Sequence, residues 1–439
     1  MSLRLAYYGD DFSGSADVLE VLAQAGLPAR LFLAPPSPAE CAGLAAVGVA
    51  GVSRALPTDQ LDGVLRPAFA ALKALGPPLV HYKVCSTFDS SPAVGSIGRA
   101  IDIGVSVVGG PCVPLVVGAP ALGRWVAFGH LFARSGRDGE VFRLDRHPTM
   151  SRHPVTPMRE SDLRLVLAEQ TDRPVTLIDA AALDVWATAG GMGGVSPLGP
   201  PASGGGVAGW VPPVVLFDTV GEHHLAPVGR LMCDLAAGGP LFAAGSSGLE
   251  YALVAHWRQA GELPPPPAFA AGPVGQVVVV SGSCSPVTDR QIGRAAEAGF
   301  ADIAVSPDAW GDAGAVLPGV LAAVRAGRSV IVHAARGPDD PRVRPTPDSG
   351  PRLGRLFAAV LDAALAAGVR RVGVAGGDTS GFVARELGVR AFDFVAPVAP
   401  GSPLVRMHAP GRAADGAEVC FKGGQVGDVR FFERLRDGS

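Results

Sequence analysis

The sequence predicts an α/β protein with two domains, each built on a mostly parallel β-sheet flanked by helices. Short apolar runs alternate with helical patterns along the chain, which is typical of parallel strands that helices cover on both faces. The 439 residues are too many for one ordinary hydrophobic core. Four consecutive prolines, Pro264 to Pro267, interrupt the alternation. Because prolines can neither continue a helix nor join the interior of a sheet, we expect a domain junction there.

The first domain is expected to span residues 1–260, followed by a proline-rich linker at residues 261–275. Helical patterns such as Ala16–Ala25 and Leu61–Leu75 separate its strands. Apolar runs of strand length predict strands at Leu3–Tyr8, Ala29–Leu33, Ala46–Val52, Leu79–Val84, Val175–Ile178, Val214–Phe217 and Leu241–Ala244.

The second domain, residues 276–439, repeats the alternation. Helices are predicted at Val287–Ala298 and Leu353–Ala367. Ser285 followed by Pro286 is a start signal for the first of these, because serine caps a helix and proline suits its first position. Apolar runs predict strands at Val277–Val280, Ile303–Val305, Val330–His333, Val372–Ala375, Phe392–Val395 and Glu418–Phe421.

Two segments of the first domain break the pattern. The more polar region His130–Asp145 predicts a hairpin or an excursion from the sheet. The segment Gly190–Pro213 is rich in glycine, proline and serine, and it predicts a surface loop. A match to the dinucleotide pattern at Gly204–Gly209 lies inside this segment with no strand before it, so we discard it.

Composition and charge exclude several classes of protein. A net charge of −3 leaves no basic excess to hold a nucleic-acid backbone. The most apolar segment, Val105–Leu122, is broken by glycines and prolines, so core strands and turns are expected rather than a membrane span. Six dispersed cysteines fit a reducing compartment, and the N-terminus lacks the pattern of a signal peptide. We expect a cytoplasmic protein that binds neither nucleic acid nor membrane.

The glycine-rich stretch Gly376–Gly381 is the most informative feature of the chain. It follows the predicted strand Val372–Ala375 and precedes a predicted short helix, Phe382–Leu387, which Gly388 closes. Such a turn points backbone N–H groups at one spot near the positive end of a helix dipole, a geometry that binds phosphate. A tight turn without a ligand is the alternative.

Two more loops of small residues follow predicted strands of the second domain, Ser281–Ser285 and Lys422–Gly427. Ligands of open parallel sheets bind beyond the carboxyl ends of the strands, so three such loops could cradle a nucleoside triphosphate. Compact turns remain the alternative, and no Walker-type phosphate loop is present. The residues expected to bind ATP are Ser281, Ser283, Gly376, Gly377, Asp378, Thr379, Gly423 and Gly424.

In the first domain, two aspartates stand at the first strand-to-helix turn. Asp10 and Asp11 lie within Gly9–Ser15. Paired carboxylates at a sheet edge suit a metal ion, a substrate hydroxyl or general-base work. Helix capping is the alternative, although one aspartate suffices for it.

The densest polar cluster of the first domain, His81–Ser91, also follows a predicted strand. Lys83 could bind a carboxylate, and Ser86 and Thr87 sugar hydroxyls. Cys85 as a nucleophile is the weaker interpretation, because small buried cysteines are usually inert. Arg54 could bind an acid group with its guanidinium fork, or be an ordinary exposed arginine. The residues expected to bind substrate are Asp11, Arg54, Lys83, Cys85, Ser86 and Thr87.

Histidines gather in Arg152–Met158 and Glu222–Leu225 without the spacing of metal ligands. Structural or substrate-contact roles are therefore favoured over metal binding.

With these residues in view, the chain resembles the four-carbon acid sugar kinase family over nearly its whole length. The segments that carry the resemblance are GDDFSGSAD (Gly9–Asp17), KVCSTFDSS (Lys83–Ser91), RHPVTPM (Arg152–Met158), EHHL (Glu222–Leu225), GSSGLEYAL (Gly245–Leu253), SGSCSPVT (Ser281–Thr288), GGDTSG (Gly376–Gly381) and FKGGQVG (Phe421–Gly427).

The resemblance implies an N-terminal acid-sugar domain, a C-terminal ATP domain and an active site in the cleft between them. The γ-phosphoryl group of ATP would pass to a terminal hydroxyl, with Mg²⁺ as cofactor. Asp10 or Asp11 would orient or deprotonate that hydroxyl, and Asp378 would lie near the metal. The partners are then an acid sugar and ATP, and a homo-oligomer is left open.

Several segments look most like the 3-oxo-tetronate 4-kinase branch, and others depart from it. Ser13 stands where the family usually has threonine, and Arg134–Ser151 looks longer than in the tetronate enzymes. The branched acid 3-oxo-isoapionate is therefore a second candidate substrate, and threonate and erythronate are further alternatives. A non-catalytic sensor of nucleotide or sugar acid is the main alternative to an enzyme. An NAD-dependent dehydrogenase lacks a credible dinucleotide fingerprint.

Overall fold

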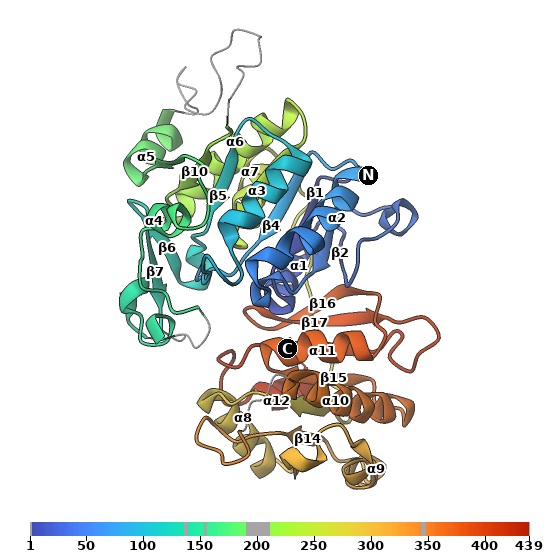
Figure 1. The fold of residues 1–439 in the computed structure, drawn as a ribbon. Helices are drawn as coiled ribbons and strands as arrows, with labels where there is room; N and C mark the ends of the chain where they lie inside the picture. The colour runs from blue at the N-terminus through green and yellow to red at the C-terminus, as the bar shows by residue number, and fades with distance from the viewer. Residues whose placement is uncertain (1, 136–138, 153–155, 190–210, 344–347, 439) are drawn as a thin grey trace. The chain divides into compact units, whose positions relative to one another are not determined.

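The computed structural model describes residues 2–135, 139–152, 156–189, 211–343 and 348–438 (Figure 1). The chain divides into two compact units, and the division runs through the predicted proline run. The N-terminal unit holds Met1–Asp10, Val21–Ala29 and Pro35–Pro266. The C-terminal unit holds Asp11–Glu20, Arg30–Ala34 and Pro267–Ser439. The domain bounds expected from the sequence stay a prediction.

Helix α1 (Phe12–Gln24) follows the first strand, and its first turns belong to the C-terminal unit. It begins before the predicted helix Ala16–Ala25.

A parallel sheet forms the centre of the N-terminal unit as far as the structure describes it. Its strand order is β3-β1-β4-β11-β5-β10-β9. The central strands are buried along their whole length, which is why they read as continuous apolar runs. The bounds are β1 (Leu5–Gly9), β3 (Ala46–Ala50), β4 (Leu79–Lys83), β5 (Val113–Val116), β9 (Val175–Ile178), β10 (Val214–Phe217) and β11 (Leu241–Gly245).

Helices cover both faces of this sheet. α2 and α3 pack against each other and on β4, whereas α6 and α7 pack against each other and on β11. The chain moves in opposite directions along the sheet through α2 and α3 and through α6, so right-handed crossovers place them on opposite faces (Figure 1). The bounds are α2 (Leu61–Ala74), α3 (Ile97–Val108), α4 (Leu163–Ala168), α5 (Ala180–Ala189), α6 (Leu225–Ala237) and α7 (Gly248–Gln259).

The polar region predicted as a hairpin or excursion is part of a small antiparallel sheet. Its strands are β6 (Arg124–Ala127), β7 (His130–Arg134) and β8 (Val141–Arg143). Buried Asp218, just beyond β10, anchors the β6–β7 turn by accepting hydrogen bonds from the backbone of Phe128 and Gly129. This sheet is thereby held at the carboxyl edge of the parallel sheet.

The C-terminal unit has a mixed sheet. The strands β13-β14-β12-β15-β18 run parallel in that order, and β17, β16 and β2 continue from β18 in antiparallel fashion. The bounds are β2 (Ala29–Phe32), β12 (Val278–Ser281), β13 (Ala301–Ala304), β14 (Val330–His333), β15 (Arg371–Ala375), β16 (Ala391–Ala399), β17 (Ser402–His408) and β18 (Glu418–Lys422).

Helices α9, α10 and α11 pack on one face of this sheet, and α8 packs with α12 on the other. The predicted start of α8 is confirmed, because the Ser285 side chain accepts a hydrogen bond from the backbone of Val287 and Pro286 is the first helical residue. The bounds are α8 (Pro286–Glu297), α9 (Leu317–Arg325), α10 (Ser349–Ala366), α11 (Gly377–Glu386) and α12 (Phe431–Asp437).

Three local predictions differ from the structure in their extent. The helix predicted at Phe382–Leu387 begins at Gly377, because Gly376 makes the sharp turn alone with φ of +125°. The predicted strand Phe392–Val395 is part of the longer β16, which pairs with the unpredicted β17 across a tight turn. The apolar segment that begins at Val105 opens with the last turn of α3 rather than with a strand.

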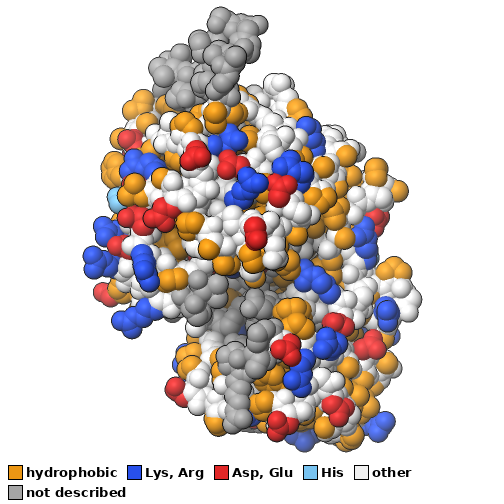
Figure 2. All heavy atoms as spheres, in the orientation of Figure 1, with side chains coloured by type: hydrophobic (Ala, Val, Ile, Leu, Met, Phe, Trp, Pro, Cys, Tyr) orange, Lys and Arg blue, Asp and Glu red, His pale blue; other side chains and the backbone are white. Residues whose placement is uncertain are grey.

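In the part of the chain that the structure describes, no helix is long and apolar enough to cross a membrane. On the face shown in Figure 2, basic and acidic side chains are interspersed, as the small net charge leads one to expect. The predicted loop Gly190–Pro213 falls almost entirely outside the described residues.

Candidate active site

Three strand ends of the N-terminal unit lie level with one another. Gly9 of β1, Lys83 of β4 and Gly245 of β11 are in register. The backbone of Asp10 donates to the Lys83 carbonyl over 2.8 Å, and Val84 donates to the Gly245 carbonyl over 2.7 Å. The predicted aspartate turn and the predicted Lys83 loop are therefore adjacent. The Gly245 turn lies on the other side of the Lys83 loop.

Asp10 and Arg54 form an ion pair inside this edge. Arg54 donates from Nε and Nη2 to the two carboxylate oxygens over 3.2 and 3.0 Å, and Asp10 is only 3% exposed. The fork of Arg54, which we expected to bind an acid group of the ligand, is therefore engaged by a residue of the protein. Burial, and to a lesser extent the negative charge of Asp10, raise the pKa of the Tyr82 hydroxyl.

The Lys83 loop is ordered by its own side chains. Lys83 is buried, and its ammonium donates to the carbonyl of Val84 over 2.9 Å. The Thr87 hydroxyl donates to Asp89 over 2.6 Å, so the Cys85 thiol must be the donor in its 3.0 Å contact with the Thr87 oxygen. No local pattern in the sequence marks Asp89 as the group that orients Thr87. Ser86 lies in the same loop and is half-buried.

A buried histidine–glutamate pair fixes the neighbouring turn. His81 and Glu250 are both fully buried, 2.6 Å apart, and His81 Nε2 lies 3.1 Å from the Gly245 carbonyl. Because a carbonyl only accepts, Nε2 carries a proton, and a second proton must lie between Nδ1 and Glu250. No local pattern in the sequence indicates this pairing, since the two residues stand far apart in the chain.

Asp11 has a different environment from Asp10. Its carboxylate accepts a hydrogen bond from the backbone of Gly14 over 2.7 Å, the arrangement of a helix cap on α1. It belongs to the C-terminal unit, where Phe12 packs edge-on against Phe392 and Phe421. The two neighbouring aspartates are therefore divided between the two units.

In the C-terminal unit the three small-residue loops also start level with one another. Ser281, Ala375 and Lys422 are the in-register ends of β12, β15 and β18. The backbone of Gly282 donates to Ala375, and that of Gly376 donates to Lys422 over 2.8 Å. The predicted ATP-binding loops are therefore brought together at one sheet edge.

Glycine is required where these loops touch. A Cβ on Gly282 would lie 2.3 Å from the Thr379 hydroxyl, and one on Gly424 would lie 2.8 Å from the Ser283 hydroxyl. Gly376 adds a positive φ that other residues rarely adopt. The three loops therefore pack this closely at the start of α11 because these positions carry no side chain.

Thr288 and Lys422 join two of the loops. Lys422 donates to the Thr288 hydroxyl over 2.9 Å and to the carbonyls of Gly423 and Gly424 over 3.0 and 3.3 Å. Thr288 in turn accepts from Ser283 and donates to Gly424. Burial lowers the pKa of Lys422 to about 8. Thr288 was not among the predicted site residues, because only the tertiary structure brings it to the loops.

Asp378 lies in the first turn of α11, but its side chain is outside the described part of the structure. Its expected roles in catalysis and in binding Mg²⁺ therefore stay predictions. The same applies to the middle of the histidine segment Arg152–Met158, where residues 153–155 are not described.

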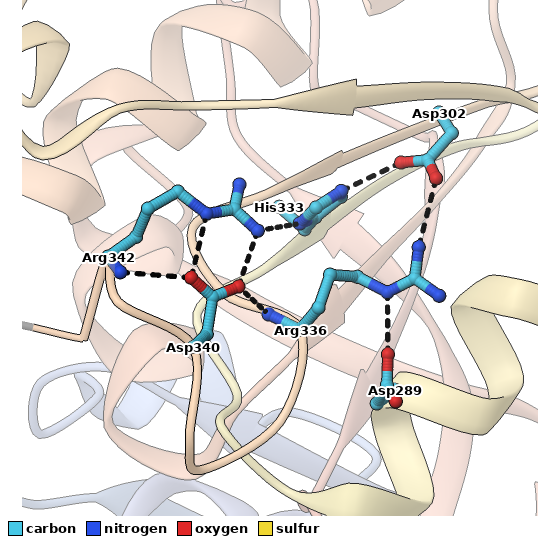
Figure 3. Close-up of polar contacts among 6 residues, drawn as sticks. All are labelled: Asp289, Asp302, His333, Arg336, Asp340 and Arg342. Carbon is cyan, nitrogen blue, oxygen red and sulfur yellow. Dashed lines mark hydrogen bonds and ion pairs between the residues drawn. The ribbon is translucent and has the colours of Figure 1, made fainter.

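A fourth strand end of the C-terminal unit carries a network of charges that we call the β14 cluster: Asp289, Asp302, His333, Arg336, Asp340 and Arg342 (Figure 3). Asp340 accepts from Arg342 Nε and Nη2 over 3.0 and 2.6 Å and from the backbone of Arg336 over 2.6 Å. Asp302 contacts His333 over 2.7 Å and accepts from Arg336 over 3.0 Å. Both guanidinium groups are neutralised by carboxylates, so the cluster ties the segment after β14 to its neighbours.

The histidines of Glu222–Leu225 meet one carboxylate. Nε2 of His223 and of His224 lie 3.1 and 2.8 Å from Asp184, and the three groups could surround a metal ion. However, His224 Nδ1 accepts a hydrogen bond from the backbone of Val220, so its Nε2 carries the proton and donates to Asp184. A protonated nitrogen cannot ligate a metal, and hydrogen bonding accounts for the cluster.

Two family models match the two halves of the chain. One, described as a sugar-binding N-terminal domain, matches residues 5–253. The other, described as a nucleotide-binding C-terminal domain, matches residues 278–432. The loops at the edge of the first sheet fall in the former, and the three small-residue loops fall in the latter.

Curated relatives match the chain from end to end. A 3-oxo-isoapionate kinase from Paraburkholderia graminis is 47% identical over 99% of this chain and 94% of its own length. A 3-oxo-tetronate kinase from Methylobacterium radiotolerans is 32% identical over 100% of this chain and 99% of its own. A solved Salmonella typhimurium structure, 23% identical over 99% of this chain and 98% of its own, shares the fold with a TM-score of 0.79. The chain belongs to the four-carbon acid sugar kinase family and is a kinase.

Proposed function

We propose that this kinase phosphorylates the terminal 4-hydroxyl of a small 3-oxo acid sugar with ATP, and that the acid is 3-oxo-isoapionate. The choice of substrate rests on one observation. The chain is 47% identical to a 3-oxo-isoapionate kinase and 32% identical to a 3-oxo-tetronate kinase, with nearly full coverage of each. The relatives with these names are all kinases, which favours catalysis over the sensor alternative.

The proposed nucleotide site is formed by Gly376, Gly377, Thr379, Ser281 and Ser283, together with Gly423 and Gly424. The support for this proposal is the in-register loop ends and the close contacts that only glycine permits. Lys422 adds positive charge to backbone N–H groups, as phosphate binding requires. Bound Mg²⁺ would neutralise charge on the triphosphate, and Asp378 is proposed to lie near it.

The proposed acceptor site is the carboxyl edge of the N-terminal sheet. Hydroxyl or oxo groups of the sugar would be bound by Lys83, Ser86 and Thr87. Cys85 would lie at the edge of this site. In the transfer, the acceptor oxygen bonds to the γ-phosphorus, the bond from that phosphorus to the β,γ-bridging oxygen breaks, and ADP leaves. The hydroxyl proton passes to a carboxylate, for which Asp10 and Asp11 are the candidates.

The Arg54 ion pair bears on which of the two carboxylates accepts the proton. Both oxygens of Asp10 accept from Arg54, which favours its ionised form and weakens it as a base. We therefore assign Asp10 to orienting the hydroxyl and Asp11 to accepting its proton. Replacing each aspartate by asparagine separates the roles, because loss of the base lowers kcat more than loss of an orienting group does.

The test is coupled ADP release with Mg-ATP and a panel of acids: 3-oxo-isoapionate, 3-oxo-tetronates, threonate and erythronate. We expect the highest kcat/KM on 3-oxo-isoapionate. Preference for a 3-oxo-tetronate would move the protein to that branch. Turnover of none of them, with ATP still bound, would overturn the proposed substrate class.

A further inference from the structure

Arg124, the first residue of β6, lies at the carboxyl edge of the N-terminal sheet. Its backbone pairs with that of Ala119 in the turn that follows β5, over 3.0 and 3.2 Å. In the same turn, the Val117 carbonyl accepts a hydrogen bond from the Ser246 hydroxyl over 2.6 Å. Ser246 directly follows β11, whose last residue is level with Lys83. Arg124 is therefore on the same edge as the proposed acceptor site.

Among the described residues, only one side of the Arg124 guanidinium takes part in hydrogen bonds. Nη1 donates to the carbonyls of Leu122, Gly123 and Arg134, over 3.3, 2.9 and 3.3 Å. Nε is buried and has no hydrogen-bond partner. Within the described ranges, no carboxylate pairs with Arg124. The contacts of Nη1 fix the orientation of the group, and its Nε–Nη2 edge is left without a partner.

That edge is the one by which other arginines of this chain hold carboxylates. Nε and Nη2 of Arg54, Arg143 and Arg164 contact the two oxygens of an aspartate, over 2.6 to 3.2 Å. Two parallel N–H donors match the geometry of a carboxylate and give a strong, oriented contact. The unused edge of Arg124 is thus an oriented receptor for a carboxylate.

The charges around Arg124 also favour a bound anion. Arg134 lies within electrostatic range of it, and neither arginine has a carboxylate partner in the described part of the chain. Burial is the main cause that lowers the pKa of Arg124, and the positive charge of Arg134 lowers it further. The Cys85 thiol acts in the opposite direction. An arginine nevertheless stays charged in proteins. A shielded donor without a partner costs free energy, and a bound anion would recover it.

We propose that the Nε–Nη2 edge of Arg124 binds the carboxylate of the acid sugar, beside Cys85. The proposal rests on the proposed function, which supplies a ligand with a carboxylate. It gives Arg124 the role that sequence analysis gave to Arg54, whose fork Asp10 already fills. If Arg124 instead only ties the carbonyls of its hairpin, it will not distinguish an acid from a neutral ligand.

The experiment compares the best acid of the panel with its primary amide, which lacks the negative charge. In the wild-type enzyme the acid should have the higher kcat/KM. In Arg124→Met, kcat/KM for the acid should fall by about 100- to 1,000-fold. The value for the amide and the KM for ATP should change by less than about threefold, since neither involves the carboxylate.

Arg143→Met is the matched control, because Arg143 lies in the same small sheet but pairs with Asp145. It should keep the acid-to-amide ratio of the wild type. An Arg124→Met enzyme that also keeps that ratio overturns the proposal. If the methionine variant does not fold, Arg124→Lys, which keeps the charge but not the fork, should still lower the ratio about tenfold.

Calorimetric binding of the acid and its amide separates this proposal from the proposed function, because it needs no turnover. A wild-type protein that prefers the acid in binding but phosphorylates none of the panel would lose the proposed substrate and keep the subsite. Equal binding of the acid to the wild type and to Arg124→Met would overturn the subsite, whatever the turnover.

Discussion

The arginines of the β14 cluster and Arg124 differ in what surrounds the guanidinium. In the β14 cluster, Arg336 and Arg342 each contact aspartates at 2.6 to 3.0 Å (Figure 3). Among the described residues, Arg124 of the other unit donates hydrogen bonds only to carbonyl groups and leaves one edge without a partner. Both places lie just beyond the carboxyl ends of parallel strands.

The presence or absence of an internal carboxylate separates structural from ligand-binding arginines in this protein. A guanidinium whose counter-charge belongs to the chain is part of the fold, because it has no reason to attract a further anion. A guanidinium held in place by carbonyl dipoles keeps its full charge and is ready to meet an anion from solution. Position at a strand end alone does not distinguish the two.

Giving Arg124 an internal counter-charge should lower activity the most. Cys85→Asp places a carboxylate within electrostatic range of Arg124, so it should compete with the substrate's carboxylate. We expect kcat/KM for the acid to fall by at least about 100-fold, while the melting temperature is unchanged or higher. Steady-state kinetics and thermal unfolding measure the two quantities.

Cys85→Asn is the control, since it has the shape of aspartate without the charge. It should lose much less activity than Cys85→Asp. Equal losses in the two variants would mean that the shape of the Cys85 side chain matters and the charge of Arg124 does not.

Lys422 extends the comparison to a buried cation that can lose its charge. Like Arg124 it donates hydrogen bonds to neutral oxygens, but burial lowers its pKa to about 8. The free enzyme should therefore lose this positive charge above about pH 8, and kcat/KM for ATP should fall about tenfold per pH unit there. Lys422→Arg should remove this dependence, because arginine keeps its proton.

Folding stability should change with pH in the opposite direction to ATP binding. The pKa of Lys422 is lower in the folded chain than the ordinary value of about 10.4, so between about pH 8 and 10 the unfolded chain binds more protons. The contribution of Lys422 to the free energy of unfolding therefore rises with pH over that range. A fall in ATP binding that followed a fall in stability would contradict this assignment.

The sequence was sufficient for the fold class and for the loops that follow the strands. Apolar runs such as Val330–His333 became buried parallel strands, and the loops at Ser281 and Gly376 came together because their strands are neighbours in the sheet. These features depend on local pattern and on the general rules of parallel sheets.

The missed residues depend on contacts between distant parts of the chain. Thr288 sits on α8 and contacts Lys422 and Gly424, and Glu250 meets His81, so no local pattern marks either. Arg124 was overlooked for a different reason. Arg124 is notable because no acidic side chain among the described residues pairs with it. Only the tertiary structure can reveal this.

Removing an arginine that is paired with an aspartate should have a smaller effect, and on stability rather than on activity. Arg342→Met would leave the Asp340 carboxylate, which is 6% exposed, with backbone donors only. We expect the free energy of unfolding to fall by about 1–2 kcal/mol, because the backbone donors still satisfy the carboxylate and Arg342 is partly exposed. Denaturant titration measures this loss, and Arg342→Met combined with Asp340→Asn should recover part of it. Loss of the acid-to-amide discrimination in Arg342→Met would contradict the division between structural and ligand-binding arginines.

The smallest effect concerns the response of the β14 cluster to acid. The hydrogen bond from Arg342 holds the pKa of Asp340 well below its usual range. A carboxyl group with a lowered folded-state pKa stabilises the fold above its unfolded pKa of about 4, and this contribution is lost as the pH falls below that value. The difference in stability between the wild type and Asp340→Asn should therefore be constant from pH 7 to about pH 5 and shrink toward pH 3. Arg124 has no carboxylate partner among the described residues, so Arg124→Met should show no comparable change in its stability difference over the same range. A parallel acid response in the two variants would mean that Arg124 has a carboxylate partner in solution, and its edge would then not be open to a ligand.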